Sequence, residues 1–250
     1  MLKLVSYNLH NSRNEREIVR NVLDFASAGV NLFCLQEVRL SKGGKFIGDA
    51  ILSALGPGWN GNFFLSPEPF LKDYGLGIVW KSEMDLVKFE NLSFDTPANF
   101  GSYQRIINLL LRAGITPFQQ RYGSLIGTFK IGKTSLRISN LHIDWRGGLE
   151  NRISQIKHLS NYLKEALVVD GEIICGDFNT LGFFENSKQV EMIHSLFGKE
   201  FINLFPDFRA TTTHFQHLDH IFARNLKIHR SLVHEVDGSD HFPLLAELSF

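Results

Sequence analysis

Short β-type runs bounded by turn residues are the feature that most restricts the fold of this chain. The runs are four to seven residues long, too short for helices, and are rich in the apolar and β-branched residues typical of strands. Two other segments, 18–26 and 153–167, repeat apolar residues every three or four positions, which predicts helices. The pattern favours an α/β fold whose sheets pack together with helices outside. The predicted strands are 2–7, 32–36, 61–65, 76–80, 125–131, 136–141, 172–175, 218–222 and 244–248.

Length and composition are those of one globular unit. The chain has 250 residues, of which 44% are hydrophobic, enough for a sizeable core. No repeat, low-complexity tract or Pro/Ser-rich linker divides it, so residues 1–250 are predicted to form a single domain. The 22 Phe outnumber 5 Tyr and 3 Trp, which favours packed sheet interiors over an aromatic platform exposed to bases.

The charges cancel overall but are unevenly distributed. With 26 Lys+Arg and 26 Asp+Glu the net charge is zero, which argues against a protein that coats nucleic acid. Residues 96–143, however, contain six Lys or Arg and no Asp or Glu, so the rest of the chain sums to −6. Within this segment, 104–112 predicts a short helix with Arg105 and Arg112 on one face. That face can bind a polyanion or a lipid head group, or it can simply be solvated.

Cysteine usage and the N-terminal region predict a cytoplasmic protein. Cys34 and Cys175 lie inside apolar runs, where a reduced thiol behaves as a small hydrophobic side chain. The chain starts with a strand-like run rather than a signal peptide. No apolar stretch approaches the roughly 20 residues that cross a bilayer. We therefore expect no stable membrane insertion, and a monomer.

The most informative local pattern is the strand-like run 172–175, which leads into Gly176-Asp177-Phe178-Asn179. Alternation along a strand places Asp177 and Asn179 on one face, where a carboxylate and an amide can address the same phosphate or water. Gly, Asp and Asn are also the common turn formers. An ordinary strand-to-turn boundary therefore accounts for the motif equally well when it is taken alone.

Further strand-like runs end in, or contain, ionisable residues. Glu37 ends one run and suits a hard cation such as Mg²⁺, although a solvated Glu at a loop start looks the same. Asp240-His241 precedes the last run, and an imidazole there can accept a proton from water. Asp219 lies inside an apolar run, where a buried carboxylate needs a partner such as His241. His142 lies in another run, where a core histidine is the competing interpretation.

Taken in chain order, these motifs resemble the endonuclease/exonuclease/phosphatase superfamily, the deoxyribonuclease I-like phosphoesterases. The resemblance implies a four-layer αββα sandwich, with two mixed sheets face to face, helices outside and the active site at one edge. Six matches between residues 8 and 241 carry it, namely Asn8, Gln36-Glu37, Asn140-x-His142, Gly176-Asp177-Phe178-Asn179, Leu218-Asp219-His220-Ile221-Phe222 and Ser239-Asp240-His241.

The resemblance also implies roles for the catalytic residues. His241 is the general base and Asp219 holds its orientation. Asp177 and Asn179 position the attacking water and stabilise the transition state, with water activation as a competing role for Asp177. His142 corresponds to the second histidine of the nuclease and sphingomyelinase branches, and Asp73 is a candidate for its acidic partner.

The same resemblance implies a divalent cation and a phosphate contact. Asn8 and Glu37 form the metal-side pair, and Asp240 lies near the metal. Carboxylate and amide oxygens suit Mg²⁺ or Mn²⁺ better than Zn²⁺. Arg39, just past Glu37, is positioned to touch a phosphate.

Three function classes remain open from the sequence. The first, which we rank ahead of the others, is a nuclease with DNA or RNA as its phosphodiester substrate. The two-histidine pattern of the resemblance favours it, as does Arg39, which follows the metal-side Glu37 closely enough to touch a phosphate backbone. The second is a phosphodiesterase or phosphatase for a lipid or small phosphoester, which the zero net charge and the apolar-basic segment 104–112 favour. The third is an inactive binding module, which the presence of every expected site residue argues against.

Overall fold

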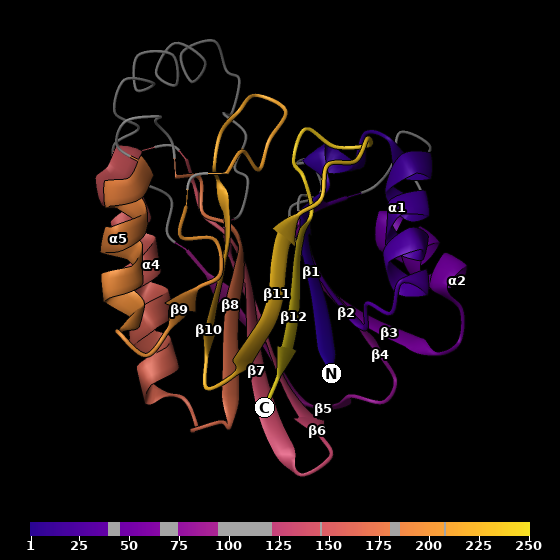
Figure 1. The fold of residues 1–250 in the computed structure, drawn as a ribbon, viewed down its shortest axis with the longest axis horizontal. Coiled ribbons are helices and arrows are strands. Elements are labelled where there is room, and N and C mark those ends of the chain that lie inside the picture. The colour runs from indigo at the N-terminus through magenta and orange to yellow at the C-terminus, as the bar shows by residue number, and fades with distance from the viewer. Residues whose placement is uncertain (40–45, 66–74, 95–121, 146, 181–185, 208) are drawn as a thin grey trace.

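Two β-sheets lie face to face between two pairs of helices in the computed structural model of the chain (Figure 1). In the described part of the chain, the strands form two six-stranded sheets. None of the described helices is both long and apolar enough to cross a bilayer. The structure describes residues 1–39, 46–65, 75–94, 122–145, 147–180, 186–207 and 209–250.

The first sheet combines strands from both ends of the chain, in the order β11-β12-β1-β2-β4-β3. β1 pairs in parallel with β2, which places Asn8 opposite Gln36, and antiparallel with β12. The C-terminal end of β1 and the loop before β12 therefore lie at the same edge. The strands are β1 (Leu2–Asn8), β2 (Leu32–Val38), β3 (Trp59–Leu65), β4 (Gly75–Lys81), β11 (Lys227–Val233) and β12 (Leu244–Ser249).

The second sheet is built from the middle of the chain, in the order β5-β6-β7-β8-β10-β9. β7 and β8 pair in parallel with His142 opposite Asp177, and β8 and β10 pair antiparallel with Asp177 opposite Asp219. Three ionisable side chains thus follow each other along one edge. The strands are β5 (Asp85–Ser93), β6 (Gly123–Ile131), β7 (Thr134–His142), β8 (Gly171–Asp177), β9 (Ile202–Asn203) and β10 (Asp219–Arg224).

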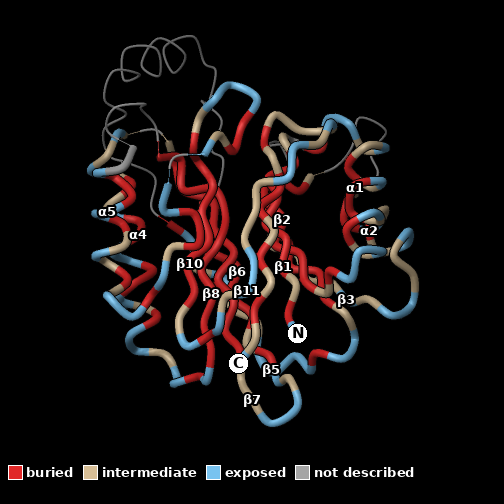
Figure 2. The backbone as a smooth tube through the Cα atoms, viewed as in Figure 1, coloured by how far each residue is buried: buried red, intermediate tan, exposed pale blue. Residues whose placement is uncertain are grey.

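Helices cover the outer face of each sheet, and Figure 2 shows the buried residues concentrated between the layers. Helices α1 and α2 pack on the first sheet through a core that includes Ile18, Val22 and Ile51. Helices α4 and α5 pack on the second sheet, and a third core fills the space between the sheets. The helices are α1 (Glu15–Ser27), α2 (Ile47–Leu55), α4 (Gly148–Glu165) and α5 (Asn186–Phe197), with a short 3₁₀ turn η1 (His10–Ser12) before α1.

The four-layer αββα sandwich is confirmed, as are the nine predicted strands, with end points that differ by a few residues. β5, β9 and β11 were not predicted. β5 and β11 lie at sheet edges and expose charged residues instead of alternating cleanly, and β9 has only two residues. The predicted helix 153–167 extends too far. α4 ends at Glu165, and Leu167 lies beyond it with 86% of its surface exposed.

Both cysteines are buried as free thiols, as predicted. Two sequence predictions fall outside the described residues. They are Asp73 and the short helix at 104–112.

Candidate active site

The predicted catalytic residues meet at one edge of the sandwich, where strand ends from both sheets lie side by side. The first sheet contributes Asn8 at the end of β1 and Glu37 near the end of β2, and the second contributes His142 and Asp177 at the ends of β7 and β8. The two sets are in contact, since Asn8 Nδ2 donates a 3.0 Å hydrogen bond to Asp177 Oδ2. The site is therefore divided between the two sheets.

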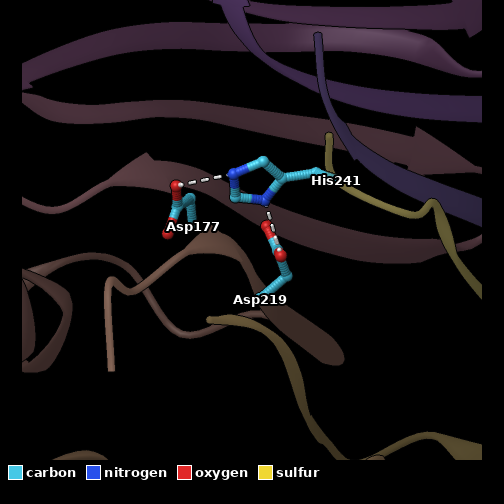
Figure 3. Close-up of side chains that lie close together, drawn as sticks. All are labelled: Asp177, Asp219 and His241. Carbon is cyan, nitrogen blue, oxygen red and sulfur yellow. Dashed lines mark hydrogen bonds and ion pairs between the residues drawn. The ribbon is translucent and has the colours of Figure 1, made fainter. Parts of the chain in front are cut away.

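His241 lies between two carboxylates of the second sheet (Figure 3). Its Nδ1 is 2.9 Å from Asp219 Oδ2, and its Nε2 is 4.0 Å from Asp177 Oδ2. All three side chains are buried, with His241 only 8% exposed. The expected pairing of Asp219 with His241 is thus present at Nδ1. The other ring nitrogen, Nε2, faces Asp177.

The segment around Thr211 holds the His241 loop in place. Thr212 forms an isolated antiparallel bridge with His241, and the Phe242 N–H donates to the Thr211 carbonyl at 2.7 Å. The Thr211 hydroxyl donates to Asp219 Oδ2 at 2.7 Å. Thr211 carried no signal in the sequence, because it lies in a segment without strand or helix periodicity.

Asp177 is the most enclosed carboxylate of the cluster. Its Oδ1 accepts a 2.8 Å hydrogen bond from the Asn179 N–H, and its Oδ2 is 3.6 Å from His142 Nε2. Burial, followed by the negative charge of Asp219, raises the pKa of Asp177 to about 8 against the opposing effect of His241. Positive charge close to such a carboxyl group would lower its pKa and favour the ionised form.

Asn179 reaches the site by a turn and not by strand alternation, which corrects the sequence argument. β8 ends at Asp177, and Asn179 has a left-handed φ of 50°. Its side-chain Nδ2 donates to the Ile143 carbonyl at 2.8 Å. The hydrogen bond from its backbone to Asp177 keeps the two residues adjacent nevertheless.

Glu37 is turned toward the site by a β-bulge. The register of β2 against β4 shifts between Gln36 and Val38, and Glu37 has a φ of 55°. Its Oε1 lies 3.4 Å from Asn8 Nδ2 and 3.9 Å from His142 Nε2. Asn8 presents its amide nitrogen to both carboxylates, while its Oδ1 accepts from the His10 N–H at 3.0 Å.

Asp240 lies at the outer part of the site with a partner that the sequence did not predict. Its Oδ1 is 2.9 Å from His10 Nδ1, and both side chains are about a quarter exposed, at 28% and 27%. Burial lowers the pKa of His10. Asp240 raises this pKa, and the positive charges of Arg13, His241 and Arg39 lower it, so that the net shift is downward. Nothing in the sequence around His10 distinguishes it from the other histidines.

The second histidine is buried and neutral. Burial, followed by the positive charge of His241, lowers the pKa of His142 to about 3. Its ring packs edge-on against Tyr122 with centroids 4.9 Å apart. The carboxylates within 4 Å of His142 among the described residues are Glu37 and Asp177, and Asp73 lies outside those residues. Arg39 follows β2 and is half-buried.

The carboxylates of the site also act on the charge of His241. Burial alone would lower the pKa of His241, but Asp219, Asp177 and Asp240 raise it to about 10. Such a histidine holds its proton at neutral pH and cannot accept another until positive charge offsets the carboxylates. Asp177, Asp219 and His241 place ligand atoms within 4.8 Å of one another. Glu37 on the opposite sheet adds a further carboxylate beside Asn8, and carboxylate and amide oxygens gathered in this way suit a divalent metal ion.

Comparisons with known proteins agree with this architecture. A sequence model described as the Endonuclease/Exonuclease/phosphatase family matches residues 5–241. A mannosyl-6-phosphatase from Bacteroides thetaiotaomicron VPI-5482 superposes with a TM-score of 0.73 at 18% identity, over 100% of both chains. TDP2 of D. rerio, complexed with a single-strand DNA product, superposes with a TM-score of 0.71 at 15% identity, over 100% of this chain and 99% of that chain. At these identities the likeness shows the fold.

One curated relative matches over part of its length. The UPF0294 protein VP2298 of Vibrio parahaemolyticus serotype O3:K6 (strain RIMD 2210633) is 30% identical over 117 residues, which is 46% of this chain. The match spans 40% of that relative.

Proposed function

The chain belongs to the endonuclease/exonuclease/phosphatase family of phosphoesterases, and from that premise we propose that it is a divalent-metal-dependent phosphodiesterase acting on nucleic acid. One observation carries the proposal. His241 is held at Nδ1 by Asp219 at 2.9 Å while its Nε2 faces Asp177, inside a cluster that also contains Asn8 and Glu37. This arrangement provides a proton acceptor next to a concentration of carboxylates that a cation can occupy.

In the proposed reaction, water attacks the phosphorus in line with the leaving oxygen. Positive charge that offsets the carboxylates would leave His241 neutral. Its Nδ1–H then donates to Asp219, and its Nε2 accepts the proton of that water. Asp177 and Asn179 orient the water and the phosphate oxygens. Asp177 can alternatively take the proton itself, because its raised pKa brings it close to neutral pH. His142, neutral at that pH, donates or accepts a hydrogen bond without adding charge.

Glu37, Asp240 and Asn8 are the residues that we propose to hold Mg²⁺ or Mn²⁺. A divalent ion supplies positive charge to a phosphate oxygen and to the leaving alkoxide, and lowers the pKa of neighbouring acids. Carboxylate and amide oxygens match the preference of these ions. The Asn8 amide faces Glu37 and Asp177 through its nitrogen, so Asn8 would also hold both carboxylates in place.

Two features favour nucleic acid as the substrate. Arg39 follows directly on the metal-side Glu37, where it can contact a flanking phosphate. TDP2, which shares the fold, is complexed with single-strand DNA.

A small phosphoester is the competing substrate class. The zero net charge favours it, and the mannosyl-6-phosphatase shares the fold equally well. Lipid phosphoesters belong to the same alternative.

A substrate panel with metal-depleted protein tests both the reaction and the substrate class. Single-stranded DNA, duplex DNA, RNA, a phosphoinositide, mannose 6-phosphate and bis-nitrophenyl phosphate are assayed with and without Mg²⁺ or Mn²⁺. We expect hydrolysis of nucleic acid that chelation abolishes and either metal restores. Faster turnover of the lipid or sugar phosphate would replace the substrate assignment, and no hydrolysis of any ester would support the inactive binding module instead.

A further inference from the structure

A pair of buried amides joins the two sheets directly beneath the candidate site. Gln36 on β2 and Asn140 on β7 are both completely buried. Gln36 Nε2 donates to Asn140 Oδ1 at 2.6 Å. The Asn140 Nδ2 in turn donates to two backbone carbonyls of the first sheet, Leu35 on β2 and Gly77 on β4, each at 2.9 Å. Asn140 therefore uses its whole amide to bind the opposite sheet.

The rest of the space between the sheets is filled by apolar side chains, including Cys34, Ile78 and Ile138. Apolar contacts are non-directional, so they hold the sheets together without fixing their relative position to a fraction of an ångström. Hydrogen bonds with fixed donors and acceptors do define that position. Gln36 Oε1 is a buried acceptor with no hydrogen-bond partner among the described residues, which opposes folding and is hard to explain by stability alone.

The amide pair is also in register with the site. Asn140 precedes His142 by two residues on β7, so both side chains lie on the same face of the strand. Ser6, whose Oγ accepts from Gln36 Nε2 at 3.2 Å, precedes Asn8 by two residues on β1. Glu37 follows Gln36 directly, and the β-bulge turns it toward the site. The buried polar residues Ser6, Gln36 and Asn140 thus lie directly beneath the site residues, further into the space between the sheets.

We propose that Gln36 and Asn140 are positioning residues that set the relative placement of the two halves of the site. The proposal rests on the proposed function, because it assigns Asn8 and Glu37 on one sheet and Asp177 and His142 on the other to one reaction. Their closest contact across the sheets is the 3.0 Å hydrogen bond between Asn8 and Asp177. Displacing one half by about 1 Å costs ~10²-fold in rate in enzymes generally.

Three variants separate positioning from simple stability. Gln36→Met removes the amide on the first sheet, and Asn140→Leu removes the amide on the second. Both substitutions keep the side-chain volume nearly unchanged. If one variant does not fold, the other still tests the proposal. Ile138→Val is the matched control, because Ile138 lies two residues before Asn140 in the same inter-sheet core. It loosens apolar packing without touching a hydrogen bond.

The readouts are the thermal midpoint, kcat and KM for the preferred nucleic acid, and Mn²⁺ affinity of the metal-free protein by calorimetry. We expect both amide variants to fold, to lose about 10- to 100-fold in kcat with KM within about 2-fold, and to bind Mn²⁺ at least about 10-fold more weakly. The double variant should lose little more than either single one, because the pair acts as a unit. Ile138→Val should lower the thermal midpoint with wild-type kcat and Mn²⁺ affinity.

The outcomes also separate this proposal from the proposed function. Wild-type kcat and Mn²⁺ affinity in a folded Gln36→Met or Asn140→Leu variant would overturn the positioning role. Losses as large in Ile138→Val, or additive losses in the double variant, would overturn it as well. A wild-type protein inactive on every ester would overturn the proposed function alone, and Mn²⁺ affinity would then decide whether the amide pair positions the site.

Discussion

The Thr211 hydroxyl donates a 2.7 Å hydrogen bond to Asp219 Oδ2, the same oxygen that lies 2.9 Å from His241 Nδ1. Thr211 Oγ1 also accepts from the backbone N–H groups of Leu218 and Asp219, at 3.0 and 3.2 Å. One hydroxyl therefore holds both the Asp219 backbone and its carboxylate. Thr211 therefore acts on the orientation of His241 through Asp219.

Thr211→Val should reduce turnover by roughly 10-fold, because the Asp219 carboxylate loses a donor that orients it. Thr211→Ser keeps the hydroxyl and should remain within about 2-fold of wild type. Steady-state kinetics on the preferred phosphodiester measure both. Equal rates in the Val and Ser variants would show that Asp219 is oriented without Thr211.

His241→Ala should lower kcat by at least ~10²-fold, because the residue is proposed to act in chemistry and not in packing. Asp219→Asn should lose a comparable factor, and the double variant should lose little more, since the two residues form one unit. Circular dichroism and thermal melts verify that the variants fold. Losses that multiply in the double variant would separate the roles of the two residues.

The protein should lose stability as the pH falls below about 6.5, through histidines that are buried in the neutral form. Burial lowers the pKa of His217 to about 4, and it lowers the pKa of His220 well below its usual value. Above pH 6.5 neither histidine binds a proton in the folded or unfolded state. Below it the unfolded state binds protons that the folded state cannot, which costs about 1.4 kcal/mol per pH unit for each histidine.

Asp177 has the opposite effect in this window, because its raised pKa makes the folded state bind the extra proton. A comparison of variants isolates the histidine contribution. His220 Nε2 lies 3.0 Å from Thr180 Oγ1, so His220→Phe costs stability at every pH. In urea unfolding, the slope of its stability against pH should nevertheless match wild type near pH 7.5 and be shallower by close to one proton near pH 5.5. An unchanged slope would mean that His220 is not buried in the neutral form.

Gly176→Ala should destabilise the fold by more than about 3 kcal/mol, or prevent folding. Gly176 has a φ of 136°, and a Cβ there would lie 2.0 Å from the Leu141 carbonyl oxygen of the neighbouring strand. Gly132→Ala is the control, because its φ is also positive at 62° but no atom lies within 4 Å of the added Cβ. Thermal melts of the two variants are then compared. Gly132→Ala reports the destabilisation caused by a positive φ alone, and Gly176→Ala reports that effect together with the steric clash. A similar midpoint for both would contradict the close approach of β7 and β8.

Several site residues could be predicted from the sequence because each occurs where a local pattern changes. Glu37 and Asp177 end apolar runs, and Asp219 interrupts one. Each of these patterns depends only on residues adjacent in the chain, so the strand ends that it predicts are found in the structure. The prediction that strand alternation orients Asn179 was wrong. Asn179 lies after the end of β8, and its own left-handed backbone conformation decides where its side chain points.

Other parts of the site carry no local signal. His10 reaches Asp240 across the whole length of the chain, and Thr211 reaches Asp219 from an irregular segment. The buried bridge between Gln36 and Asn140 joins strands that no pattern places opposite one another. These contacts depend on how the two sheets pack, which involves many weak apolar interactions spread over the core.

By itself, the sequence determined where strands end and which of those ends carry carboxylates, amides and imidazoles, because burial and turn formation are encoded in the order of adjacent residues. Only the tertiary structure decided how these groups pair. Asp219 holds His241, and Asp177 lies between His241 and His142 with Asn8 bonded to it from the opposite sheet. The register of β8 and β10 and the packing of one sheet on the other set those distances, and both are formed by residues far apart in the chain.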